Sequence, residues 1–276
     1  MCVFSMFSIF YVVKKYNMQS MIFSAGLGTR FKPWTDNHPK ALAIVNGKSL
    51  LQRNIEYLQQ HGIKDIIVNV HHLADQVDQA IVENDGWGSN ILVSDERDEL
   101  LDTGGGLMKA KELFAPGERF ITCNVDILTS LDISKLLNFH SANNALISFG
   151  VTNRTSSRYL LFDENKRLCG WRNTKTGEEK GPHLELRSQF SQSSIAPQGG
   201  GTRTLLSEKA YSCVVVFEYA IFKLMEEENF SGKFSLIDVY LKLAANHLIM
   251  GYDHSGDHLV DVGRPESVAV AESIFV

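Results

Sequence analysis

Cysteine is scarce in this sequence, and its placement argues against two kinds of site. The four cysteines, Cys2, Cys123, Cys169 and Cys213, are scattered through 276 residues, and no two of them form a CxxC pair or another tight spacing. A disulfide framework or a zinc site would need closely spaced cysteines. We therefore expect a reducing, cytoplasmic environment.

An excess of positive charge is also lacking. Lysine and arginine number 27 against 32 acidic residues, which gives a formal net charge of -5. Proteins that bind nucleic acid usually present a basic surface. We expect no nucleic-acid partner, so any site for a polyanion must be local.

No apolar run near the N-terminus is long enough to cross a membrane. The run before Lys14 is shorter than the roughly 20 residues that a spanning helix needs. Lys14 and Lys15 follow this run, whereas a secretory signal carries its positive charge first. We expect no membrane partner, and we interpret residues 1–17 as a disordered extension or the product of an upstream start, with Met18 as the natural start.

Strand-like and helix-like segments alternate in the first half of the chain, in units of about 30 residues that are typical of βαβ crossovers. After residue 145 strand-like runs follow one another without helices, so antiparallel strands are expected there. We predict one α/β domain over residues 18–276, with a Rossmann-like, mostly parallel mixed sheet sandwiched by helices and a substrate-facing layer around 150–215. The polar, glycine-rich stretch 183–204 is expected to be a long loop or lid. Strands are predicted at 19–23, 64–70, 90–96, 119–128, 145–151, 157–163, 166–173 and 209–217, and helices at 50–60, 73–84, 218–228 and 234–247. A glycine turn that opens a helix is predicted over 102–114, and a strand, a turn and a helix over 259–276.

The stretch SAGLGTRFKPWTDNHPKAL, from Ser24 to Leu42, follows the first strand. It lacks the GK[ST] ending of a P-loop, and Phe31 replaces the third glycine of a dinucleotide fingerprint. Its glycines let backbone N–H groups approach an anion, and Arg30, Lys32 and Lys40 supply positive charge. A triphosphate suits this loop, and a solvated basic loop is the alternative.

These residues resemble the signature of the sugar-1-phosphate nucleotidyltransferases, AGxGTRL, PLT and PKxxxPV. The matching segments are Ala25–Phe31, Pro33–Thr35 and Pro39–Lys40, and the likeness is closest to the N-acetylmuramate-1-phosphate uridylyltransferases and the mannose-1-phosphate guanylyltransferase-like bacterial members. The resemblance implies a nucleotide-diphospho-sugar transferase (GT-A-like) fold and a reaction of an NTP with a sugar 1-phosphate to give an NDP-sugar and pyrophosphate. UTP or GTP is favoured, and a monomer or small homo-oligomer is expected.

The same resemblance assigns roles in the loop. It implies that Arg30 and Lys40 contact the nucleotide phosphates and stabilise the departing pyrophosphate. The residues that it assigns to nucleotide binding are Ala25, Gly26, Gly28 and Thr29.

Two aspartates are candidates for a magnesium site. Asp126 ends a buried strand, where ligands of α/β sheets bind, and Mg²⁺ prefers one or two carboxylates together with phosphate oxygens. The alternative is that Asp126 caps the next helix, although Asp132 is better placed for that. Asp261 follows another apolar strand and resembles the DxGTP segment of the family, with Arg264 where threonine is frequent.

A third motif, Leu101–Gly106, resembles the GTAGxL or ETGGG loop of the family. The resemblance implies that Thr103, Gly104 and Gly105 approach the base and ribose, and plain turn geometry is the alternative. Asp102 is a nearby candidate for base selection.

Weaker signals concern the sugar phosphate and two histidines. Arg154 and Arg158 are candidates for gripping a sugar phosphate, or are solvated charges at a strand edge. Many relatives have Glu-Lys-Pro where this chain has Trp171-Arg172-Asn173, so Arg172 or Lys175 is a candidate to replace that lysine. His71 and His72 lack metal-ligand spacing and are expected to be structural.

Two rival functions remain open from the sequence. One is a catalytically silent nucleotide-sugar-binding relative. The other is a cytidylyltransferase acting on phosphocholine or a similar alcohol phosphate, since such enzymes share the N-terminal signature.

Overall fold

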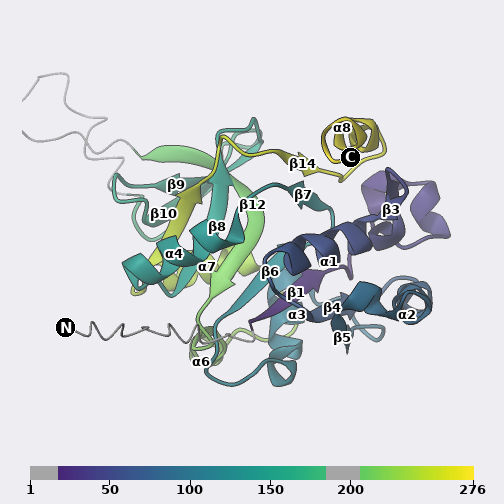
Figure 1. Cartoon of the computed structure of the whole chain (residues 1–276). Helices are drawn as coiled ribbons and strands as arrows, with labels where there is room; N and C mark the ends of the chain where they lie inside the picture. The colour runs from purple at the N-terminus through teal and green to yellow at the C-terminus, as the bar shows by residue number, and fades with distance from the viewer. Residues whose placement is uncertain (1–17, 185–205) are drawn as a thin grey trace, which may run out of the picture.

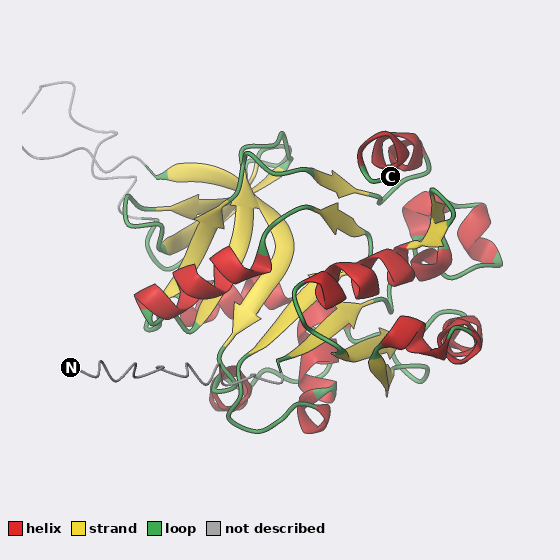
Figure 2. Cartoon of the chain, in the orientation of Figure 1, coloured by secondary structure: helices red, strands yellow, loops and turns green. Residues whose placement is uncertain are grey.

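The computed structural model describes residues 18–184 and 206–276. Figure 1 shows the elements, and Figure 2 shows helices on both sides of a central sheet. The strands are β1 (Gln19–Phe23), β2 (Ile44–Val45), β3 (Lys48–Ser49), β4 (Asp65–Val70), β5 (Asn90–Asp95), β6 (Phe120–Asn124), β7 (Ile127–Thr129), β8 (Ile147–Thr152), β9 (Arg158–Phe162), β10 (Leu168–Asn173), β11 (Glu179–Lys180), β12 (Ser207–Phe217), β13 (Ile249–Asp253) and β14 (Leu259–Asp261). The α-helices are α1 (Leu50–Gln60), α2 (Ala74–Glu83), α3 (Asp102–Lys109), α4 (Ile133–Asn143), α6 (Ile221–Glu227), α7 (Leu236–Leu243) and α8 (Glu266–Ile274).

The central sheet is mixed. Strands β5, β4, β1 and β6 are parallel, and β12 is antiparallel to β6 and to β8, while β13 runs parallel to β8. The remaining strands follow in the order β12, β9, β10 and β11, all antiparallel to their neighbours. The predicted α/β fold is therefore confirmed, including the change to antiparallel strands in the second half.

Alternation of side chains along the buried strands divides the interior into two cores. Within β1, Ile22 packs into one core, whereas Met21 and Phe23 pack into the other. Helices α1, α2, α4 and α8 contribute to the first core, and α3, α6 and α7 to the second. A strand buried on both faces needs apolar residues at successive positions, which explains the continuous apolar runs of β1 and β12.

Local signals place the helix starts as expected. Ser49 caps α1, and its side chain accepts a hydrogen bond from the N–H of Gln52 at 3.1 Å. Asp132 caps α4 by accepting from the N–H of Ser134 at 2.9 Å. Because Asp132 caps α4, this helix does not need Asp126 as a cap, and Asp126 is available for binding.

Other expectations are corrected or fall outside the described residues. The glycines at 104–106 lie inside α3 rather than in a turn before it, and β13 was not foreseen. The leader 1–17 lies outside the described residues, as does the expected lid beyond Leu184. None of the helices in the described ranges is long and apolar enough to cross a bilayer.

Candidate nucleotide-binding site

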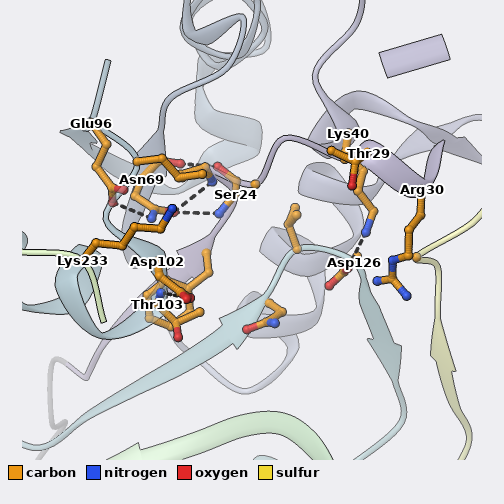
Figure 3. Close-up of a pocket in the computed structure, with 18 residues that line it drawn as sticks. Ser24, Thr29, Arg30, Lys40, Asn69, Glu96, Asp102, Thr103, Asp126 and Lys233 are labelled. Carbon is orange, nitrogen blue, oxygen red and sulfur yellow. Dashed lines mark hydrogen bonds and ion pairs between the residues drawn. The ribbon is translucent and has the colours of Figure 1, made fainter. Parts of the chain in front are cut away.

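A pocket of about 400 Å³ opens at the carboxyl ends of the parallel strands. Ligands of open α/β sheets bind at this edge, where the strand ends and the following loops converge. Figure 3 shows that its side chains form two groups, with Arg30, Lys40 and Asp126 at one end and Asp102, Thr103 and Lys233 at the other. The residues that line it are Phe23, Ser24, Ala25, Gly26, Gly28, Thr29, Arg30, Lys40, Asn69, Glu96, Leu100, Asp102, Thr103, Asn124, Val125, Asp126, Lys233 and Gly263.

Buried polar side chains fix the start of the glycine-rich loop. The Asn69 side chain accepts a hydrogen bond from the N–H of Ser24 at 2.7 Å and from that of Ala25 at 3.3 Å, and donates to the Glu96 carboxylate at 2.7 Å. Glu96 is fully buried and also accepts from the N–H of Leu101 at 3.3 Å. Burial raises the pKa of Glu96 above its ordinary value, although these hydrogen bonds oppose the rise. The network ties the ends of β1, β4 and β5 together beneath the pocket.

Gly28 is required by the shape of the loop. Its φ of 61° lies in the left-handed region, and a Cβ there would come within 2.8 Å of the Thr35 side chain and 3.1 Å of Lys40. Thr35 donates a hydrogen bond to the Gly28 carbonyl at 2.9 Å. The loop therefore folds tightly against the segment that carries Lys40.

Arg30, Lys40 and Asp126 line one end of the pocket, and Asp261 lies next to them beside Gly263, outside the lining. Lys40 forms an ion pair with Asp126, and its side chain is only 10% exposed. A Cβ built on Gly263 would lie 2.6 Å from Asp261 Oδ1 and 2.7 Å from Arg30 Nη2, so Gly263 sits between these two side chains.

The pairing of β7 with β14 brings the two aspartates together. Asp261 is the register partner of Ile127, and the N–H of Val262 donates to the Asp126 carbonyl at 2.8 Å. Segments far apart in the sequence thus place the backbones of the two aspartates next to each other. In the residues that the structure describes, no group of three or more His, Cys, Asp or Glu side chains forms a metal cluster.

The donor set nevertheless fits a hard divalent cation. Asp261 Oδ1 is buried and has no hydrogen-bond partner within the described ranges, although buried carboxylate oxygens are normally paired. Mg²⁺ typically takes one or two carboxylates and completes its shell with phosphate oxygens and water. Asp126 and Asp261 supply that number of ligands.

Arg154 acts electrostatically on Cys213, the same residue that both aspartates affect. Burial, together with the charges of Asp126 and Asp261, raises the pKa of the Cys213 thiol well above its usual range, while Arg154 opposes the rise. Arg154 donates to the Tyr211 carbonyl at 2.9 Å, and its Nε is buried without a partner in the described ranges.

The other predicted sugar-phosphate cations lie elsewhere. Arg172 is held by Glu208 at 2.7 Å and by Glu179 at 3.4 Å, so its charge is already balanced. Arg158 lines a separate pocket of about 180 Å³ beside Trp171. Lys175 is exposed in the turn after β10, away from the lining of the main pocket.

The glycines of α3 serve packing. The N–H groups of Gly104 and Gly105 donate to the Phe234 carbonyl at 2.9 and 3.2 Å, and neither glycine lines the pocket. A Cβ on Gly104 would lie 2.4 Å from the Phe234 ring, and one on Gly105 would lie 2.2 Å from the Gly232 carbonyl oxygen. These glycines therefore let the 232–236 loop dock on α3, and their N–H groups are occupied.

Sequence reasoning did not single out Lys233, Asn69 or Glu96. No local motif marks these residues, since each reaches the pocket through the docking of a strand end or loop. The two histidines were expected to be structural, and both contact backbone oxygens. A ring nitrogen of His71 lies 2.7 Å from the Glu96 carbonyl oxygen, and one of His72 lies 3.0 Å from the Thr35 carbonyl oxygen.

This combination of sheet, glycine-rich loop and strand-end carboxylates defines a nucleotide-diphospho-sugar transferase fold. Over 94% of this chain and 100% of the other, the structure superposes on HddC from Yersinia pseudotuberculosis complexed with GMP-PN, with a TM-score of 0.69 and 20% identity. Residues 19–165 match the family model described as Nucleotidyl transferase. The chain belongs to this family, which confirms the resemblance.

Two curated relatives indicate different substrates. The chain is 39% identical over 109 residues to N-acetylmuramate alpha-1-phosphate uridylyltransferase of Caulobacter vibrioides, a match that covers 39% of this chain and 45% of the relative. It is 51% identical over 79 residues to choline-phosphate cytidylyltransferase of Streptococcus pneumoniae, which covers 29% of this chain and 33% of the relative. The chain thus matches less than half the length of each.

Proposed function

We propose that this protein is a Mg²⁺-dependent nucleotidyltransferase that joins an NTP to a sugar 1-phosphate, giving an NDP-sugar and pyrophosphate. One observation carries the proposal: the Lys40–Asp126 ion pair lies at the carboxyl edge of the sheet together with Gly263, which Arg30 and Asp261 flank. UTP with an amino-sugar phosphate is the substrate pair that we favour. The free thiols of Cys123 and Cys213 suit a cytoplasmic location.

For this reaction the protein must mainly position the two substrates and stabilise the charge that develops. An oxygen of the sugar phosphate, already ionised at neutral pH, attacks the α-phosphorus in line, so no general base is required. Arg30 and Lys40 neutralise the charge that develops on the departing pyrophosphate. Backbone N–H groups of the loop at Gly26 and Gly28 hold the phosphates close to these cations, with Ala25 and Thr29 beside them.

Asp126 and Asp261 would hold the magnesium ion. When bound, the ion supplies charge that draws the reacting phosphates together. Asp126 has a second task, because its ion pair keeps the Lys40 ammonium at the same end of the pocket.

The sugar phosphate is proposed to lie on the side of Arg154. This arginine and both aspartates act electrostatically on the same residue, Cys213, and the Arg154 Nε is buried without a partner in the described ranges. It belongs to the layer around residues 150–215 of the single domain 18–276, of which the structure describes 150–184 and 206–215. Arg158, Arg172 and Lys175 are left out of the proposed site because of their positions.

A panel of substrates tests the proposal. Purified protein with Mg²⁺ is given each of the four NTPs with several sugar 1-phosphates, and pyrophosphate release is measured. We expect release with a restricted set of pairs and a loss of at least about 100-fold in the Lys40→Met variant. The matched control is Lys48→Met, which removes an exposed lysine that pairs with Glu56. Absence of pyrophosphate with every pair would reject the proposal in favour of a binding protein.

A cytidylyltransferase that acts on phosphocholine is the second candidate. The 51% identity to the Streptococcus pneumoniae enzyme over 79 residues favours it. Adding phosphocholine and CTP to the same panel separates the two, since this candidate requires turnover with that pair above all others.

A further inference from the structure

Lys233 and Asp102 lie at the end of the pocket opposite Arg30 and Lys40 (Figure 3). Within the described parts of the chain, the Lys233 ammonium has no ion pair or hydrogen bond. The Asp102 carboxylate there accepts only from the N–H of Thr103, at 2.6 Å, and it meets no cation. A cation and an acid without charged partners therefore face the same space.

The position of Lys233 is built into the fold. The N–H of Phe234 donates to the Leu101 carbonyl at 3.2 Å, and the N–H of Leu236 donates to the Thr103 hydroxyl at 3.1 Å. Together with the two N–H groups of α3 that donate to the Phe234 carbonyl, these bonds fasten the chain to α3 directly after Lys233. The backbone that carries Lys233 is therefore held next to the start of α3, where Asp102 lies.

This end of the pocket suits a base better than phosphates. Two carboxylates, those of Asp102 and the buried Glu96, line it, and a triphosphate placed here would meet both. The cations Arg30 and Lys40 lie at the other end, where the phosphates belong under the proposed function.

The two side chains have opposite hydrogen-bonding character. A lysine ammonium only donates hydrogen bonds, and an ionised aspartate only accepts them. Their complement is a base edge with a carbonyl oxygen next to a ring N–H, as in uracil and guanine. Cytosine and adenine present an amino group next to a bare ring nitrogen, which is the reverse polarity.

We infer that Lys233 and Asp102 read this edge, with Lys233 donating to the carbonyl oxygen and Asp102 accepting from the ring N–H. They would thereby select UTP or GTP over CTP or ATP. The inference rests on the proposed function for the placement of the phosphates, and it names two specificity-determining residues for that reaction.

Kinetics and equilibrium binding with all four NTPs test the inference. In Lys233→Met we expect kcat/KM for UTP and GTP to fall at least about tenfold, while the values for CTP and ATP change less than about twofold. Asp102→Asn should lower the preference for UTP over CTP by about tenfold, because an amide both donates and accepts. Lys233→Arg should restore most of the preference. Lys223→Met is the matched control, since Lys223 lies on α6 with its side chain 79% exposed and pairs with Glu227.

Other results would overturn the inference. An equal fall for all four NTPs in Lys233→Met would mean that Lys233 contacts phosphates, and unchanged constants would mean that it contacts nothing. The Kd of each NTP, measured without sugar phosphate, separates this outcome from failure of the proposed function. A protein that releases no pyrophosphate but binds UTP more tightly than CTP through Lys233 would reject the reaction and keep the base selection.

Discussion

Replacing Gly263 by alanine is a direct test of the phosphate end of the pocket. The backbone of Gly263 lies outside the left-handed region, so alanine is compatible with its conformation. The added Cβ would lie 2.6 Å from Asp261 Oδ1 and 2.7 Å from Arg30 Nη2. The nearest atoms to the added Cβ therefore belong to two proposed functional side chains.

The size of the effect follows from these distances. To reach ordinary contact near 3.4 Å, Asp261 Oδ1 must move from 2.6 Å, or about 0.8 Å, and Arg30 Nη2 about 0.7 Å. A misplacement of about 1 Å at reacting groups can cost on the order of 100-fold, so we expect kcat to fall about 10- to 100-fold. Stability should change little, because Arg30 is exposed and alanine also restricts the unfolded chain; we expect a Tm within about 3 °C of the wild type.

The assay is steady-state pyrophosphate release together with thermal unfolding. Gly256→Ala is the matched control, since nothing lies within 4 Å of its added Cβ and its φ is not positive. A Gly263→Ala enzyme with a normal kcat would refute the roles of Asp261 and Arg30. A large fall in Tm would instead show that the substitution damages the fold.

Three further outcomes are expected. Asp126→Asn should lose at least about 100-fold in kcat while remaining folded, because an uncharged amide is a poor magnesium ligand; near-normal rates in saturating Mg²⁺ would contradict this. Gly105→Ala should lower the Tm by about 2 to 12 °C relative to Gly256→Ala, since its Cβ would meet the Gly232 carbonyl oxygen at 2.2 Å and such overpacking costs about 1–3 kcal/mol. Burial lowers the pKa of His140 below its ordinary value of 6.5, so its contribution to the free energy of unfolding is full above that pH and is lost as the pH falls through the folded-state pKa. The Tm of the wild type should therefore fall between pH 7.5 and 5.5 more than that of His140→Gln; equal falls would count against this cause.

Most of the fold was predictable because its signals are local. Two helix starts are fixed by side chains that accept hydrogen bonds from nearby backbone N–H groups. Ser49 accepts from the N–H three residues ahead, and Asp132 accepts from the N–H two residues ahead. The apolar runs of β1 and β12 mark strands buried on both faces. The short strand β7 escaped separate prediction because only Val125 and Asp126 separate it from β6, and its pairing with β14 depends on a distant segment.

The sequence by itself determined the proposed phosphate end of the site. Gly28, Arg30 and Lys40 belong to one segment to which the proposed function assigns phosphate binding, so a motif suffices to find them. Asp126 could be found in the same way, because its position at the end of an apolar strand is visible in the sequence.

Only the tertiary structure decided the rest. Glu208 takes up the charge of Arg172, which the sequence offered as a phosphate ligand, and the docked 232–236 loop brings Lys233 beside Asp102. The glycines of α3 look like a ligand-binding loop in the sequence but receive a loop of the same chain. The physical reason is that strand pairing and loop docking decide which distant side chains meet, and neither leaves a periodic pattern in the sequence.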